Sequence, residues 1–167
     1  MKKILSLTMA LAMLGTALTG CGSKDAVTQA PAENTQQTAP VQQEQSQTEK
    51  ALSLINTFAT GDTATARSLL SDGYIQHNLA YGTGADAFIG SVEYLASADV
   101  KTTVNNIRAF EDGDKVFLQT IYNFAGAGEQ VAFDIFRFDE NGKIAEHWDV
   151  METIADQSTW QNQNGKF

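Results

Sequence analysis

The chain of 167 residues is poor in cysteine and proline, and each scarcity excludes something. Because Cys21 is the only cysteine, no intramolecular disulfide can form, and the folded part must be stabilised by its hydrophobic core. The only prolines are Pro31 and Pro40, so nothing after residue 40 interrupts a helix or strand by lacking a backbone N–H.

Basic residues are scarce as well. Eleven Lys and Arg stand against twenty Asp and Glu, a formal net charge of −9 at pH 7. Lys2 and Lys3 lie in a segment that we expect to be removed, which leaves −11. So acidic a chain does not attract nucleic acid or anionic headgroups by charge, and we expect no nucleic-acid partner.

The first twenty residues have the layout of a secretory signal, a positive start followed by an apolar run from Ile4 to Leu18. That run is shorter than the roughly 20 apolar residues of a membrane-spanning helix. The string Leu18-Thr19-Gly20-Cys21 resembles the bacterial lipoprotein box. The resemblance implies acylation of Cys21 and a lipid-anchored chain at the cell membrane or outer membrane, facing the extracytoplasmic side. The alternative is an ordinary secretory signal beside a chance cysteine.

Composition divides the remaining chain into three parts. Residues 21–47 hold both prolines and no aromatic residue, so they cannot bury enough apolar surface to fold and are expected to form a disordered tether. We place the folded domain at 48–154. A polar tail, 155–167, follows it, and Trp160 is the residue of this tail expected to pack back onto the domain.

Apolar spacing predicts helices first and strands afterwards. Helices are expected over 49–60, from Asp62 through Leu70, and over 86–96. Ser71-Asp72-Gly73 is expected to form a turn before a short extended piece at 74–78. The apolar period then changes to two, which predicts strands near 100–110, 115–124, 130–138 and 143–153, with hairpin turns at 111–114 and 139–142. This order predicts an α+β fold with N-terminal helices packed on one face of a curved antiparallel sheet.

The last predicted hairpin brings titratable side chains together. If Asn141 and Gly142 are the two central residues of its turn, Phe136 pairs with His147 and Asp134 with Asp149. Asp134, His147 and Asp149 then share one face with Ala132, Phe136, Phe138, Ala145 and Met151. Arg137, Glu146 and Trp148 lie on the opposite face.

Two carboxylates and an imidazole on an apolar face are unfavourable unless they are paired or hydrated. Burial and mutual repulsion raise the pKa of such a carboxyl group and suit it to acid–base catalysis. The alternative is a purely structural network in which His147 bridges the two aspartates, and metal binding is a further alternative that the residue types permit. For His77 and Asn78, at the end of the short extended piece, the alternative to a binding role is a turn that satisfies the backbone.

Three strings of sequence resemble the SnoaL-like polyketide cyclase family, of the nuclear-transport-factor-two-like and ketosteroid-isomerase-like superfamily. They are Tyr74-Ile75-Gln76-His77-Asn78, Phe133-Asp134-Ile135-Phe136-Arg137 and Gly142-Lys143-Ile144-Ala145-Glu146-His147-Trp148-Asp149-Val150. The resemblance extends over roughly 50–153. It implies a cone-shaped curved sheet wrapped around the N-terminal helices, with an apolar pocket.

The resemblance also implies a role for each candidate residue. Asp149 matches the acid–base of an intramolecular aldol ring closure, and we expect His147 and Asp134 beside it. A small apolar carbonyl compound is expected as the ligand, with no cofactor and no metal, in contact with Tyr74, His77, Asn78, Phe136 and Met151. Members of the superfamily often pair through the outer sheet face, which implies a homodimer. The alternatives are a ligand-binding lipoprotein without turnover and a protein-interaction module.

Overall fold

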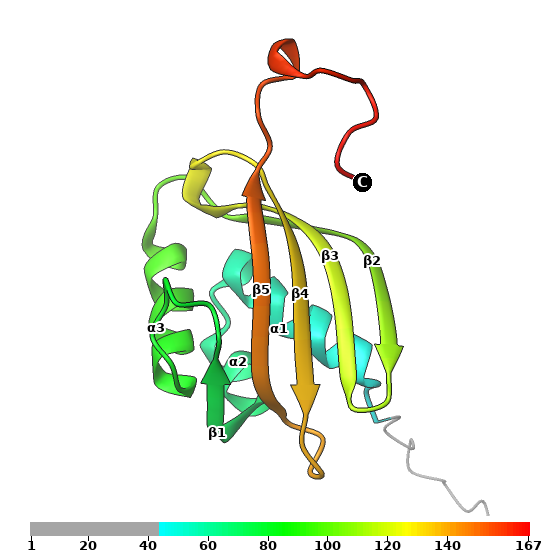
Figure 1. Ribbon diagram of the computed structural model, residues 1–167. Coiled ribbons are helices and arrows are strands. Elements are labelled where there is room, and N and C mark those ends of the chain that lie inside the picture. Colours follow the sequence, from blue (N-terminus) through cyan, green and yellow to red (C-terminus); the bar gives the residue numbers. More distant parts are fainter. Residues whose placement is uncertain (1–43) are drawn as a thin grey trace, which may run out of the picture. The chain divides into compact units, whose positions relative to one another are not determined.

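A computed structural model of the chain describes residues 44–167. The expected signal, Cys21 and most of the expected tether lie outside the described residues. The described part is an α+β domain, as predicted (Figure 1). Its helices and strands are α1 (Gln47–Thr60), α2 (Thr63–Leu69), β1 (Leu70–Gln76), α3 (Ala85–Ser97), β2 (Thr103–Asp112), β3 (Lys115–Asn123), β4 (Gln130–Phe138) and β5 (Ile144–Thr153). Two short 3₁₀ helices, Phe124–Gly126 and Gln157–Thr159, complete it. No helix in this stretch is both long and apolar enough to cross a membrane.

Local capping sets both ends of α1. Ser46 and Glu49 form a capping box, each side chain accepting a hydrogen bond from the other's backbone N–H. The helix therefore begins at Gln47, two residues before the expected start and at the residue where the tether was expected to end. It stops at Gly61, whose left-handed φ of 74° is unfavourable for any other residue. A Cβ at Gly61 would also lie only 2.8 Å from the Ala96 Cβ on α3.

The sheet has the order β1-β5-β4-β3-β2. Strands β2 to β5 pair antiparallel, as predicted, but β1 pairs parallel with β5, so the sheet is mixed rather than wholly antiparallel. Strand β1 also corrects two local expectations. Leu70 belongs to this strand instead of the preceding helix, and Ser71-Asp72-Gly73 lie within the strand instead of a turn. The pairing of β1 with β5 is irregular between Leu70 and Ile75.

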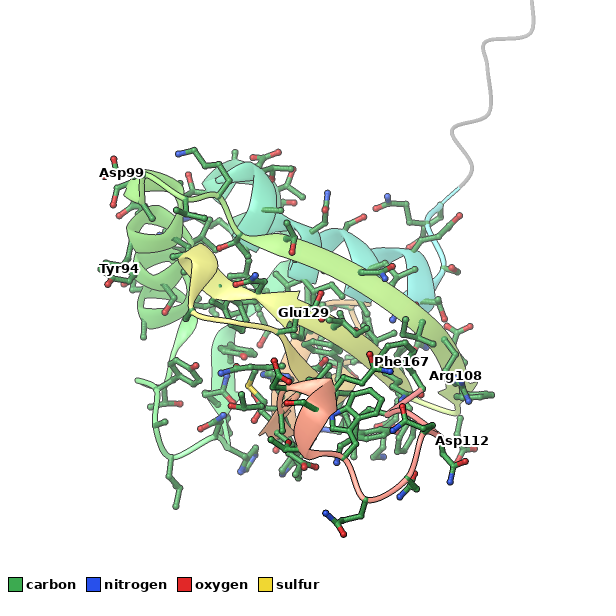
Figure 2. All side chains as sticks on the ribbon, turned by 90° about the horizontal axis from the view of Figure 1, so that it is seen from above. Tyr94, Asp99, Arg108, Asp112, Glu129 and Phe167 are labelled. Atoms are coloured by element: carbon green, nitrogen blue, oxygen red, sulfur yellow. The ribbon has the colours of Figure 1, made fainter. Side chains whose placement is uncertain are left out.

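The helices and the C-terminal tail lie on opposite sides of the sheet (Figure 2). The core fills the helix side, with Leu54, Val92, Leu118 and Phe136 almost fully buried. On the other side, which we call the outer face, the Gln119 side chain donates a hydrogen bond to the Lys166 carbonyl at 2.8 Å. Trp160 donates its indole N–H to Ala155 within the tail.

The β4–β5 hairpin has the predicted register, although its turn differs from the expected one. Asp139 pairs with Lys143 across a three-residue loop, so the expected two-residue turn is wrong. A one-residue irregularity follows, because Phe138 pairs with Ile144 but Arg137 with Glu146. Ile144 therefore takes the core position that was expected for Ala145. The odd loop and the bulge cancel, and the predicted pairs Phe136–His147 and Asp134–Asp149 are confirmed.

Candidate functional site

A cavity of about 840 Å³ lies between the helices and the inner face of the sheet. Eight of the side chains that line it are aromatic, among them Phe58, Phe88, Tyr94 and Phe124. Within residues 44–167, the titratable acidic and imidazole side chains that line it are those of Asp134, Asp149 and His147, and no Lys or Arg lines it. The cavity therefore has apolar walls and a single polar region on β4 and β5.

Asp134 is fully paired inside this polar region. One carboxylate oxygen lies 3.1 Å from His147 Nε2, and the other accepts a hydrogen bond from the Tyr122 hydroxyl at 3.0 Å. Asp134 and His147 are 4% and 7% exposed. Burial, with the adjacent Asp134 carboxylate, raises the pKa of Tyr122 well above its ordinary value, so the phenol keeps its proton and donates. Asp134 thus acts as a fixed acceptor for two neighbours.

Gln76 determines which nitrogen of His147 carries a proton. The backbone N–H of Asn78 donates to Gln76 Oε1 at 2.9 Å, so the other amide atom must be the nitrogen. That Nε2 lies 3.0 Å from His147 Nδ1 and donates to it. Because Nδ1 accepts, the proton of the neutral ring is on Nε2 and is directed at Asp134. Stacking on Phe136, with ring centroids 4.4 Å apart, holds the ring in this orientation.

Asp149 differs from Asp134 in having a free oxygen. Its Oδ1 accepts from the Asn78 side-chain amide at 2.5 Å, while Oδ2 is 4.0 Å from His147 Nε2, beyond hydrogen-bond distance. The Asp149 side chain is only 6% exposed and lines the cavity. Burial raises the pKa of this carboxyl above its ordinary 3.8, Asp134 adds to the rise, and His147 and Asn78 oppose it. A buried carboxyl group with a free oxygen and a raised pKa is suited to taking up and releasing protons.

The same three residues have the types of a metal site, with one donor atom from each lying within 4.8 Å of the others. A metal ion on His147 Nε2 would require the ring proton to move to Nδ1, where it would face the N–H of Gln76. It would also compete with Tyr122 and Asn78 for the carboxylates. The donor set therefore fits proton transfer better than metal coordination.

The structure brings most of the predicted site residues together. Tyr74, Phe136 and Met151 line the cavity with the three titratable residues, and Asn78 reaches the site through its bond to Asp149. His77 does not join them. It lies on the outer face, 2.8 Å from the Glu146 carboxylate and stacked on Trp148 at 4.4 Å. Because side chains alternate along an extended segment, His77 faces the side opposite to Tyr74 and Gln76.

Gln76 is the site residue that sequence reasoning missed. The alternation of β1 places it on the same side as Tyr74, but an uncharged amide gave no chemical signal by itself. Its role depends on a partner 71 residues away in the sequence. Only the pairing of β1 with β5 creates that contact.

Changing Gln76 to glutamate is expected to put a proton on both nitrogens of His147. The new carboxylate would still accept from Asn78 but would also accept, instead of donate, at His147 Nδ1. Nitrogen-15 NMR of the imidazole reads this directly, and His77→Gln assigns the signals because the chain has only two histidines. A wild-type spectrum with the proton on Nδ1 would contradict the assignment.

The sequence profile of a family described as SnoaL-like domain matches residues 51–147. No curated protein matches the chain. Similar solved structures include an NTF2-like protein from Cytophaga hutchinsonii, with 16% identity, a TM-score of 0.57, and coverage of 67% of this chain and 95% of that one. A protein described as a polyketide cyclase from Bacillus cereus has 15% identity, a TM-score of 0.55 and coverage of 64% and 74%. An epoxide hydrolase from M. tuberculosis has 17% identity, a TM-score of 0.54 and coverage of 62% and 80%. At these identities the structures support the fold alone.

Proposed function

The chain belongs to the SnoaL-like domain family, and from this premise we propose that its cavity binds a small apolar carbonyl compound and that Asp149 transfers protons at the carbon next to the carbonyl. The free Asp149 oxygen in an aromatic-walled cavity is the observation that carries the proposal. The neighbours described as a polyketide cyclase and an epoxide hydrolase are compatible with acid–base chemistry in this fold.

In the proposed step, Asp149 Oδ2 removes a proton from the carbon beside the carbonyl, and the electrons of that bond form an enolate. The enolate carbon then attacks a second carbonyl of the same molecule, and the alkoxide formed there takes the proton from Asp149. Alternatively, the enolate takes the proton back at another carbon. The enolate oxygen needs a hydrogen-bond donor, since negative charge develops there.

Tyr74 is the donor that supports this step best. Its hydroxyl already accepts from Gln76 at 3.3 Å, so its own hydrogen is free to point into the cavity. Burial and the nearby Asp149 and Asp134 carboxylates raise the pKa of Tyr74 well above its ordinary value, and the hydroxyl keeps its proton. The N–H of His147 is directed at Asp134, so these two residues position the site instead of exchanging protons.

The test is deuterium uptake by candidate ligands in D₂O. A panel of apolar ketones and 1,3-dicarbonyl compounds is incubated with the protein, and exchange beside the carbonyl is followed by mass spectrometry. We expect exchange above that given by an equal concentration of acetate and imidazole. If calorimetry detects binding but no compound exchanges, the protein is a ligand-binding module without turnover, which is the alternative function.

We also propose that the chain is anchored to a membrane through acyl chains on Cys21. Changing Cys21 to alanine is expected to abolish labelling by an alkyne fatty acid in a bacterial host and to remove the chain from the membrane fraction, because acyl chains supply the membrane affinity. Ser23→Ala, two residues away, is the matched control and should keep the label. Labelling that persists in Cys21→Ala would contradict the anchor.

The outer face supports self-association as a further proposal. Phe110, Phe117, Ile135 and Trp148 are neighbours across β2 to β5 and form one apolar row over the sheet. In the next row Phe133 and Val150 are 55% and 72% exposed. The Arg137–Glu146 ion pair beside them is neutral overall, so two copies could meet here despite the acidic net charge.

Changing Val150 to glutamate is expected to shift a dimer to monomers in sedimentation velocity, because it buries a charge in the proposed interface. Val150 is exposed, so the substitution should leave the fold intact. Leu79→Glu, at a 99% exposed position away from the sheet, is the matched control. A wild-type chain that stays monomeric at high concentration would exclude this interface.

A further inference from the structure

We propose that the cavity selects ligands bearing a positively charged, hydrophobic ammonium group, as a quaternary ammonium or a protonated amine, over neutral and anionic ligands of the same shape. The proposal rests on the cavity being a ligand site, as in the proposed function, but it does not depend on turnover. The proposed carbonyl chemistry does not specify the charge of the rest of the ligand.

The charge balance of the cavity is the first argument. Asp134 and Asp149 both line it, and none of the described residues that line it is a Lys or Arg. His147 accepts a hydrogen bond from Gln76 at Nδ1 and directs its Nε2 proton at Asp134. Even a protonated His147 would compensate only one of the two carboxylates. Anionic ligands are therefore repelled, and a cation restores neutrality.

The position of the free carboxylate oxygen is the second argument. The Asp149 side chain is only 6% exposed, and among the described residues no donor lies within hydrogen-bond distance of its Oδ2. This oxygen is not one of the fully buried polar atoms that lack a partner, so it opens onto the cavity, where water or a cationic ligand can compensate its charge. An ammonium group placed against Oδ2 would do so, and the low polarity of the surroundings would strengthen the attraction.

The aromatic walls are the third argument. Eight aromatic rings surround the cavity, from α1, α3, β1, β3 and β4 and the loops beside them. Two of them, Tyr81 and Tyr94, are 51% and 74% exposed and so stand where the cavity meets solvent. Faces of Phe and Tyr rings attract alkylammonium groups, and several rings around a carboxylate are a common arrangement for binding them. The walls can thus favour the cation while still accepting its apolar part.

Ionisation of the site should make the affinity for a cationic ligand depend on pH. Tyr74 and Tyr122 face the polar region but keep their protons, since burial raises both pKa values. Asp149, whose pKa is also raised, is the group that gains negative charge as the pH rises. Asp134 and His147 are the titratable groups beside it. Affinity for a quaternary ammonium should therefore increase as the pH passes upward through the pKa of Asp149, whereas affinity for a neutral analogue should not increase.

Three probes of one shape test the selection. They are benzyltrimethylammonium, its neutral carbon analogue neopentylbenzene, and the anion benzylsulfonate. Each is titrated into the full chain at pH 7 and followed by amide NMR, which also reports where the probe binds. We expect the cation to bind at least about tenfold more tightly than the neutral analogue and to shift the signals of cavity residues. Benzylsulfonate should not bind.

Asp149→Asn should remove most of the preference for the cation while leaving binding of neopentylbenzene nearly unchanged. Glu140→Gln removes one negative charge from the exposed β4–β5 loop and is the matched control, which should keep the preference. Equal affinity for the cation and the neutral analogue, or a preference that survives in Asp149→Asn, would overturn the proposal. Failure of deuterium exchange with ketones would leave this result unaffected, so the two hypotheses fail separately.

Discussion

Replacing Asp149 with asparagine is expected to slow proton exchange beside the ligand carbonyl by about 10²–10⁴-fold, the usual contribution of a positioned acid–base group. An amide has nearly the shape of the carboxylate and can still accept from Asn78, but it cannot take a proton at Oδ2. The measurement is the exchange rate in D₂O, compared between the wild type, Asp149→Asn and the loop control Glu140→Gln.

The pH profile of the same exchange provides a second readout. The base must be ionised, so the rate should rise with pH through the pKa of Asp149, which burial places above 3.8. In Asp149→Asn this rise should disappear. A rate that is equal in the wild type and the variant, with both folded, would assign the proton transfer to another group.

Loss of activity in Asp149→Asn should not come from loss of folding. Because the pKa is raised in the folded state, the folded chain still holds a proton on Asp149 at pH values where the unfolded chain has lost it. Stability conferred by this group therefore falls as the pH rises from the ordinary pKa through the raised one. At neutral pH the ionised Asp149 is unfavourable for the fold, and asparagine should leave the melting temperature equal or higher.

Replacing Phe136 with alanine is expected to lower the free energy of unfolding by about 3–5 kcal/mol. The ring is 1% exposed, stacks on His147 and lines the cavity. Its removal loses apolar burial and frees the imidazole to leave the orientation in which it donates to Asp134. Urea unfolding followed by far-ultraviolet circular dichroism measures the change.

Phe133→Ala is the matched control, because it removes the same ring from the same strand. Phe133 points to the outer face and is 55% exposed, so the expected loss is under about 1 kcal/mol. Similar losses for the two variants would show that the two faces of β4 are not assigned correctly. Because the outer face is the proposed interface, the unfolding free energies of the wild type and Phe133→Ala must be compared at a concentration where both proteins are monomeric.

Much of this fold was predictable because its signals are local. Gly61 is the capping residue at the end of α1, and the change of apolar period after α3 marks the strands. The capping box of Ser46 and Glu49 is equally local, but the expected start at residue 49 missed it. The alternation of β4 and β5 placed Asp134, His147 and Asp149 on one face, and the pairing Asp134–Asp149 followed from the position of the hairpin. The family resemblance implied an acid–base role for Asp149, and this role stays a prediction.

Other features could not be predicted, because they depend on contacts between distant segments. No local pattern states that β1 lies parallel beside β5, and this contact brings Gln76 to His147 and Asn78 to Asp149 across 71 residues. The same pairing places His77 beside Glu146 on the outer face. The loop and bulge of the last hairpin were not visible in the sequence either, although they cancel.

The sequence by itself therefore determined the fold class, the strands of the main hairpins and the side of the sheet that carries the two aspartates and His147. Periodicity and capping act over a few residues, and these features need nothing more. Only the tertiary structure decided that Asp134 is paired while Asp149 keeps a free oxygen, and which nitrogen of His147 bears the proton. Those properties arise from burial and from hydrogen-bond partners that folding brings together, and the charge and reactivity of a carboxyl group depend on such surroundings more than on its neighbours in the chain.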